Sequence, residues 1–243
     1  MKYSSKTDNG KKRENNQDSH FIGQNTDGTL FAVVCDGMGG AGNGDIASKM
    51  AVDYIVNTMM TLYRPNMSDL VIKSILVSAV EEANKLIFER AGRDKALSGM
   101  GTTVVAALIS EEFAYIAHAG DSRAYLINEG GIIQLTRDHS VVQNMLERGE
   151  ITSLEAENHP KKNLITRALG VEKTVKIDFY QEEFPKGARL LMCTDGLSNY
   201  VSAGEIIEIC SCCETEGCSQ RLVDRANKNG GGDNITVIVA ENE

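Results

Sequence analysis

The sequence predicts an α+β fold in which antiparallel sheets are covered by helices. Three apolar segments rich in β-branched residues follow one another across short turns, as in an antiparallel meander: residues 101–109, 113–119 and 123–128. Helical patterns come in pairs: residues 44–63 with the segment after Ser68, and residues 204–213 with 219–228. A doubly wound parallel sheet would need strands and helices to alternate, and this chain does not alternate them.

Composition and length exclude several classes of protein. The chain has 243 residues, 42% of them hydrophobic, and no repeat or Pro/Ser-rich linker divides it, so we expect one domain over residues 1–243. A net charge of -9 opposes nucleic-acid binding by bulk attraction. The longest apolar runs are too short to cross a bilayer, and residues 1–8 carry no apolar signal. We therefore expect a cytoplasmic protein without membrane contact.

The first predicted unit is a β-hairpin. Residues 30–35 form an apolar, β-branched run bounded by turn formers, which predicts a buried strand ending at Asp36. Residues 19–23 precede it across a turn at 25–28, so we expect the two strands to pair. The polar, asparagine-rich residues 7–18 predict neither helix nor strand.

Two helices are expected after the hairpin. Residues 44–63 place apolar side chains at helical spacing, and Pro65 ends the pattern. Ser68 is positioned to cap a second helix, whose apolar stripe extends to Ile87. Amphipathic packing explains both stripes, so they predict core faces and no cofactor site.

The periodicity changes after the meander. Residues 138–170 are poorly periodic apart from a short helix ending at Gly149, which predicts a mobile surface flap. Strands are expected again at residues 175–183 and 188–194, and a last strand at 235–240. With the second helix pair between them, these segments complete the fold.

The six cysteines are expected to be reduced thiols, because the chain shows no secretion signal. Cys35 and Cys193 lie in apolar strand-like runs and are expected to be small core residues. The cluster from Cys210 to Cys218 lacks the second pair or nearby histidine that a zinc site needs. We interpret it as a helix end with partly buried thiols.

Four aspartates share one arrangement, a carboxylate where a strand meets a glycine-rich turn: Asp36, Asp121, Asp195 and Asp233. Oxygen ligands without soft donors suit Mg²⁺ or Mn²⁺, and carboxylates brought this close would repel one another without cations. Two such ions about 3.5–4 Å apart can aim a hydroxide at phosphorus. Arg13 is a natural bidentate partner for a phosphate, and Asp18 lies close to it in the sequence.

Seven motifs occur in one order along nearly the whole chain, at residues 13–18, 34–40, 99–103, 119–123, 135–139, 193–197 and 232–236. In this respect the chain resembles the metal-dependent protein phosphatases of the PP2C (PPM) family, and most of all its bacterial stand-alone Ser/Thr phosphatases. The resemblance covers residues 8–240. It implies an α-β-β-α sandwich of two antiparallel sheets flanked by helix pairs, with the site between the sheet edges and the flap at about 138–170.

The resemblance also implies the metal ligands. Asp36 would bridge two Mn²⁺ or Mg²⁺ ions, with Asp195 and Asp233 on the first ion and the Gly37 carbonyl on the second. Asp121, together with Asp195, would hold a third and weaker ion. These residues stand at the family's motif positions in this sequence.

Two further residues would complete the catalytic set. By resemblance, Asp18 would hold a metal-bound water and Arg13 would clamp the phosphate. The reaction would be direct attack of a metal-bridging hydroxide on phosphoserine or phosphothreonine, without a phosphoenzyme. Gln17 stands where many members carry Glu, so we expect a somewhat weaker second metal. Met38 replaces a histidine of animal members, so the general acid is water, either bound to metal or held by Asp18.

Two other functions stay open from the residues alone. A two-metal phosphodiesterase or nuclease would use similar carboxylates, but the acidic balance and the absence of interleaved basic and aromatic residues oppose it. A metal-free relative that only binds phosphoproteins is disfavoured because every expected metal aspartate is present. The resemblance suggests that the substrates are phosphorylated proteins, among them a cognate Ser/Thr kinase and its targets. We also expect a monomer.

Overall fold

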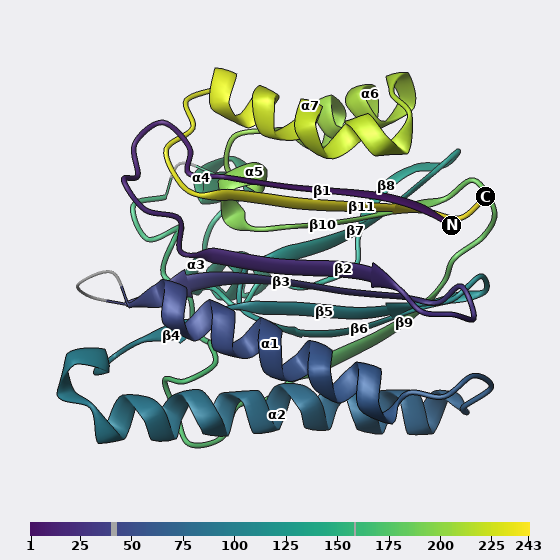
Figure 1. The fold of residues 1–243 in the computed structure, drawn as a ribbon. Helices are drawn as coiled ribbons and strands as arrows, with labels where there is room; N and C mark the ends of the chain where they lie inside the picture. The colour runs from purple at the N-terminus through teal and green to yellow at the C-terminus, as the bar shows by residue number, and fades with distance from the viewer. Residues whose placement is uncertain (40–42, 158) are drawn as a thin grey trace.

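The computed structural model describes residues 1–39, 43–157 and 159–243. Its elements form four layers, with a helix pair on the outside of each of two facing sheets (Figure 1). The paired strands of these residues are all antiparallel. The predicted α+β class, an α-β-β-α sandwich, is therefore confirmed.

The two sheets are built from strands of both halves of the chain. In spatial order, the first sheet contains β1 (Lys2–Asp8), β11 (Ile235–Glu241), β10 (Arg189–Cys193), β7 (Arg123–Asn128) and β8 (Gly131–Gln134). The second contains β2 (Asp18–Gln24), β3 (Leu30–Met38), β5 (Val104–Ile109), β6 (Phe113–Ala119) and β9 (Asp178–Glu183), with β4 (Gly101–Thr102) paired to the end of β3.

The helices cover the outer faces of the sandwich (Figure 1). The second sheet is covered by α1 (Gly44–Leu62) and α2 (Asp69–Arg93), and a short 3-10 turn, η2 (Lys95–Leu97), follows them. The first sheet is covered by α5 (Asp195–Ser198), α6 (Ala203–Cys212) and α7 (Thr215–Lys228). Two further helices, α3 (Val141–Glu147) and α4 (Ser153–Glu157), belong to the segment expected to be a flap. Within the described ranges, no helix has the length and apolar character to span a bilayer.

Strand β3 shows why the apolar run after residue 29 is continuous. Its alternate side chains enter two different cores: Phe31 and Cys35 face the core under α1 and α2, while Ala32 and Val34 face the core between the sheets. Burial on both faces removes the polar alternation of a half-exposed strand. Cys35 and Cys193 are fully buried, as expected for small core residues.

Two strands were not predicted. β1 pairs with β11 over its whole length, yet only Ser4 of its residues is buried, so its sequence carries little apolar signal. β8 is a short, partly exposed edge strand paired with β7. Both strands exist because a neighbouring strand offers backbone hydrogen bonds, which side-chain patterns do not reveal. Ser68 occupies the N-cap position of α2 as predicted, but its hydroxyl accepts no capping hydrogen bond.

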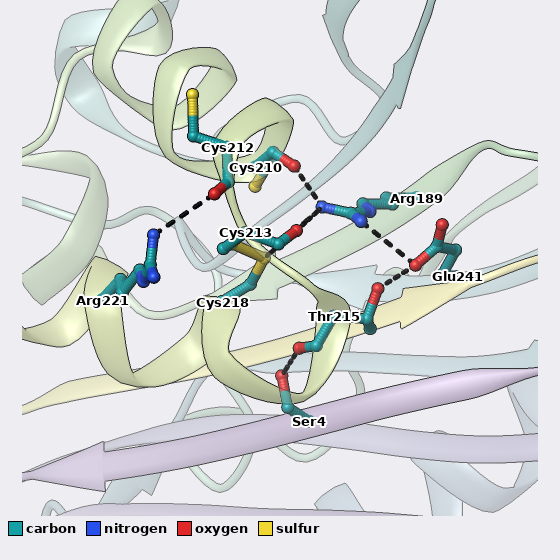
Figure 2. Close-up of a disulfide and its surroundings, with 9 residues drawn as sticks. All are labelled: Ser4, Arg189, Cys210, Cys212, Cys213, Thr215, Cys218, Arg221 and Glu241. Atoms are coloured by element: carbon teal, nitrogen blue, oxygen red, sulfur yellow. Dashed lines mark hydrogen bonds and ion pairs between the residues drawn. A yellow bond between two sulfur atoms is a disulfide. The ribbon is translucent and has the colours of Figure 1, made fainter.

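The expectation that all six cysteines are free thiols is wrong for two of them. Cys213 and Cys218 form a disulfide, and their Cα atoms lie 5.8 Å apart (Figure 2). The cause is local, because α6 ends at Cys212 and α7 begins at Thr215, so the chain reverses direction within this short segment. The prediction of free thiols rested on the cellular compartment and took no account of this turn.

Arg189 of β10 holds the same turn to the sheet. Its guanidinium donates to the carbonyl oxygens of Cys210 and Cys213 and pairs with Glu241 of β11 (Figure 2). The exposed thiol of Cys212 points away from the disulfide (Figure 2). The four sulfurs of this cluster therefore do not converge, and no zinc-type set of ligands occurs in the part of the chain that the structure describes.

Candidate active site

Five aspartates meet at one end of the sandwich. Asp18 and Asp36 are directly opposite each other in the β2–β3 pair. Asp121 lies in the turn between β6 and β7, Asp195 follows β10, and Asp233 precedes β11. The carboxyl groups lie close enough for the other four to repel a charge on Asp36. The expected gathering of acidic side chains is thus present.

The local structure around these aspartates differs in part from the prediction. Asp36 and Gly37 lie within β3, which continues to Met38, and Asp195 opens the short helix α5 where a glycine turn was expected. The glycine cluster of this motif includes Gly40, which lies outside the described residues. Only Asp121 and Asp233 lie in turns of the predicted kind.

The backbone of Asp36 is fixed by two threonines. Its N–H donates to the hydroxyl of Thr103 (2.9 Å), and its carbonyl oxygen accepts from the Thr102 hydroxyl and the Thr103 N–H (2.9 Å each). The Thr103 hydroxyl also lies 2.7 Å from that of Ser122, beside Asp121. Thr103, at the break between β4 and β5, therefore connects the backbone of Asp36 to the residue that follows Asp121.

Gly37 has no room for a side chain. A Cβ atom there would lie 2.1 Å from the carbonyl oxygen of Gly44 and 2.4 Å from that of Gln17. The Gly37 N–H donates to the same Gln17 carbonyl, at 3.1 Å. Glycine is required because the start of α1 packs directly against the end of β3.

One carboxylate oxygen of Asp18 accepts two hydrogen bonds, and the other accepts none from the described residues. Its Oδ2 accepts from the hydroxyls of Thr194 (3.0 Å) and Thr236 (2.7 Å). Its Oδ1 is buried and has no hydrogen-bond partner among the described residues. A buried, unpartnered carboxylate oxygen is costly unless a cation or water satisfies it. The two threonines were not predicted as site residues, since a hydroxyl near a strand end is common.

Burial and mutual repulsion raise the pKa values of Asp18, Asp36, Asp121 and Asp195. Burial, opposed by the two threonine hydroxyls and reinforced by Asp195, raises the pKa of Asp18 to about 7. Burial and then Asp195 raise the pKa of Asp121 to about 8, and burial and then Asp233 raise that of Asp195 to about 6. Burial first, and repulsion second, raise the pKa of Asp36 well above its usual value. A cation bound among these carboxyls would therefore stabilise their ionised forms.

Arg13 reaches this cluster from the loop between β1 and β2. Its Nε and Nη2 donate to the two carboxylate oxygens of Asp233, each at 2.9 Å. This bidentate pair raises the pKa of Arg13. The Arg13 side chain is 52% exposed, so its guanidinium borders both the aspartates and solvent. An arginine at this position is available to a phosphate that approaches the cluster.

The residues fit a site for hard divalent cations. The donors are carboxylates, and both Asp18 and Asp195 present a buried Oδ1 without a partner among the described residues. No three acidic, histidine or cysteine side chains within those ranges are already arranged around a single point as ligands of one ion. Asp233 is turned to Arg13, and Asp18 to its two threonines. The carboxylate of Asp233 is therefore engaged by Arg13, whereas Asp18 keeps its Oδ1 free of partners among the described residues.

Comparison with known proteins identifies the family. The model of the family described as "Protein phosphatase 2C" matches residues 7–225. The chain belongs to the protein phosphatase 2C family. The serine/threonine phosphatase stp of Listeria monocytogenes is 39% identical over 239 residues, covering 98% of this chain and 94% of that protein. The prediction of a protein serine/threonine phosphatase, a hydrolase of this family, is confirmed.

Solved structures agree with the phosphatase fold. The serine/threonine phosphatase Stp1 from Staphylococcus aureus is 34% identical and superposes with a TM-score of 0.92, covering 100% of this chain and 95% of that one. The catalytic domain of PstP in complex with two manganese ions is 33% identical, with a TM-score of 0.86 over 99% of this chain and 97% of that domain. The family is thus metal-dependent, and one related structure contains manganese.

A stacked histidine pair joins the Asp121 turn of the phosphatase to the segment at 138–170. The rings of His118 and His139 lie 4.7 Å apart between centroids. The ring Nδ1 of His139 accepts a hydrogen bond from the Gly120 N–H, and the backbone N–H of His139 donates to the Gly120 carbonyl oxygen. His118 is fully buried, and burial lowers its pKa to about 3, so its ring is neutral.

Both ends of that segment meet at this pair. The Thr166 N–H donates to the His139 carbonyl at 2.7 Å, and Ser140 forms a β-bridge with Ile165. Arg167 pairs with Asp178 of β9, which also lies 3.1 Å from His139 Nε2. The segment between these anchors therefore leaves and rejoins the sandwich beside Asp121.

Proposed function

We propose that this serine/threonine phosphatase hydrolyses phosphoserine and phosphothreonine in proteins at the five-aspartate site, using two Mn²⁺ or Mg²⁺ ions and a third, weaker one. The observation that supports this most is the cluster of carboxyls with raised pKa values, two of which carry an unpartnered buried oxygen beside Arg13. Such a cluster is unstable without cations and suited to binding them.

In this proposal Asp36 would be a ligand of both ions. Asp195 and Asp233 would hold the first ion with it, the Gly37 carbonyl would serve the second, and Asp121 with Asp195 would hold the third. When bound, the ions lower the pKa of a coordinated water to near neutrality and neutralise charge on the phosphoryl oxygens. Gln17 adds no charge beside the second ion, so that ion binds somewhat more weakly.

The remaining steps belong to side chains of the chain itself. Arg13 binds two phosphoryl oxygens through its parallel N–H groups and fixes the phosphorus for in-line attack. Asp18, held by its Oδ2, uses its free Oδ1 to orient a water molecule. Because Met38 cannot donate a proton, this water is the proposed source of the proton for the leaving serine or threonine oxygen.

We also propose the biological setting that goes with this chemistry. The substrates are phosphorylated proteins, among them a cognate Ser/Thr kinase and its targets, and the enzyme acts as a monomer of one domain. The segment at 138–170 serves as a flap beside the site. An acidic net charge of -9 opposes a nuclease reading of the same carboxylates.

A comparison of substrates tests the proposed function. With Mn²⁺, we expect phosphate release from p-nitrophenyl phosphate and from a phosphothreonine peptide, and no cleavage of single- or double-stranded DNA or RNA. EDTA should remove the activity, and added Mn²⁺ should restore it. Full activity in EDTA would refute the metal-dependent mechanism, and faster cleavage of nucleic acid than of the phosphopeptide would favour the nuclease.

A further inference from the structure

The loop that carries Arg13 has no helix or strand of its own. It joins β1 to β2, and its backbone is held by a few hydrogen bonds of its own and by contacts with residues 231–234. Arg13 is half-exposed, and Asp233 is the partner of its guanidinium. A long side chain on such a loop loses much conformational freedom when it binds a phosphate, so anything that fixes the loop improves that binding.

One buried amide ties both ends of this loop. Asn234 is only 5% exposed and follows Asp233 at the start of β11. Its Nδ2 donates to the carbonyl oxygens of Asn9 (3.1 Å) and Asn15 (3.0 Å). Its Oδ1 accepts from the Gln17 N–H, at 2.9 Å. Both hydrogens and the oxygen of the amide are thus used by one loop, at positions on either side of Arg13.

This pattern of donors and acceptor fits asparagine specifically. Aspartate would present an oxygen to two carbonyl oxygens, and alanine would remove the side-chain partner of three backbone groups of the loop. Contacts of the loop backbone bring it against the segment that precedes β11. The Lys11 N–H donates to the Gly231 carbonyl at 2.7 Å, and Gly10 has φ +73° with its Cβ position 2.1 Å from the Asp233 carbonyl oxygen.

We propose that Asn234 is a positioning residue for Arg13: its side-chain amide fixes the 9–17 loop at the distance from Asp233 at which the guanidinium meets the phosphate. This inference rests on the proposed role of Arg13 in phosphate binding. Asn234 itself touches no substrate. Asn234 affects the reaction only through the loop that carries Arg13. Its effect on kcat/KM can therefore be measured only when Arg13 is present.

A double-mutant cycle tests the proposal. We expect Asn234→Ala to lower kcat/KM for p-nitrophenyl phosphate about tenfold, mostly through KM, and to weaken inhibition by inorganic phosphate, because the released loop holds Arg13 less often at the phosphate position. Arg13→Ala should lower kcat/KM further. In the Arg13→Ala background, Asn234→Ala should lower kcat/KM hardly any further, because Asn234 affects the substrate only through the position of Arg13.

The matched control is Asn242, just beyond the far end of β11. It is 2% exposed, and its Nδ2 likewise donates to two backbone carbonyls, those of Glu111 and Phe184, away from the site. Asn242→Ala should lower Tm to a similar degree and leave KM and phosphate inhibition unchanged. Equal kinetic effects of the two alanine variants would reduce Asn234 to a stabilising residue and overturn the proposal.

Other results separate this inference from the proposed function. Suppose that Arg13→Ala lowers kcat/KM and that Asn234→Ala lowers it by the same factor with and without Arg13. Asn234 then acts independently of Arg13, and only this inference fails. The same conclusion follows if Asn234→Ala weakens Mn²⁺ binding measured by calorimetry. If Arg13→Ala leaves kcat/KM unchanged, the phosphate role of Arg13 fails as well. Should Asn234→Ala not fold, rapid hydrogen exchange of the Gln17 amide in the wild-type protein would still overturn the proposal.

Discussion

Replacing Asp36 with asparagine is expected to abolish phosphatase activity while it stabilises the metal-free protein. Asp36 is the carboxylate that we assign to both ions, and losing several kcal/mol of transition-state stabilisation reduces the rate by about a thousandfold or more. Its pKa is raised well above the usual value by burial and by the other four aspartates. A neutral amide removes that repulsion, so Tm in EDTA at pH 8 should rise.

Two measurements, one of activity and one of stability, test this prediction together. Hydrolysis of p-nitrophenyl phosphate in Mn²⁺ and thermal unfolding in EDTA are measured on the same preparations. Asp53→Asn, on the exposed side of α1, serves as the control and should change neither quantity appreciably. A loss of activity accompanied by a lower Tm would indicate damage to the fold, and retained activity would contradict the role of Asp36.

The metal-free protein is expected to become less stable between pH 6.5 and pH 8. The pKa values of Asp18 and Asp121 are raised to about 7 and about 8, whereas unfolded aspartates titrate near the usual value of 3.8. The folded state therefore retains protons that the unfolded state has lost, and stability falls as pH rises through the folded pKa values. Each retained proton costs about 1.4 kcal/mol per pH unit.

The window is chosen because histidines act in the opposite sense mainly below it. Burial lowers the pKa values of His20, His118 and His139 below the ordinary 6.5, so these residues favour folding as pH rises through 6.5, and their contribution levels off by about pH 7.5. Thermal unfolding in EDTA at pH 6.5, 7.25 and 8 measures the slope.

Added Mn²⁺ should reverse the trend, because cations replace the protons, and the rise in Tm should be largest at pH 8. Stability that is flat or rises with pH in EDTA would contradict the assignment of raised pKa values to the cluster.

Much of the site was predictable because its aspartates follow or precede apolar strands. Antiparallel pairing places such strand ends at one edge, and the predicted hairpin puts Asp18 and Asp36 at the ends of paired strands, although their direct pairing was seen only in the structure. The supporting contacts were not predictable in this way. Asn234 binds the Gln17 backbone across 217 positions, and Thr236 reaches Asp18 across 218. Short polar side chains near strand ends show no sequence periodicity, so the sequence does not predict which distant residues they bind.

The same limit explains the missed strands and the disulfide. β1 is held by backbone pairing with β11, with few buried side chains to mark it. The Cys213–Cys218 bond depends on how closely α6 and α7 follow each other, which spacing alone did not fix. Patterns of apolar residues identify elements that bury side chains, and they say little about elements defined by backbone or short-range closure.

Anomalous diffraction at the manganese edge, from crystals grown with Mn²⁺, tests the gathering of acidic side chains around ions most directly. We predict two strong peaks within ligand distance of Asp36, one also touching Asp195 and Asp233 and the other the Gly37 carbonyl. An active preparation whose crystals show manganese elsewhere, or none beside Asp36, would contradict the account.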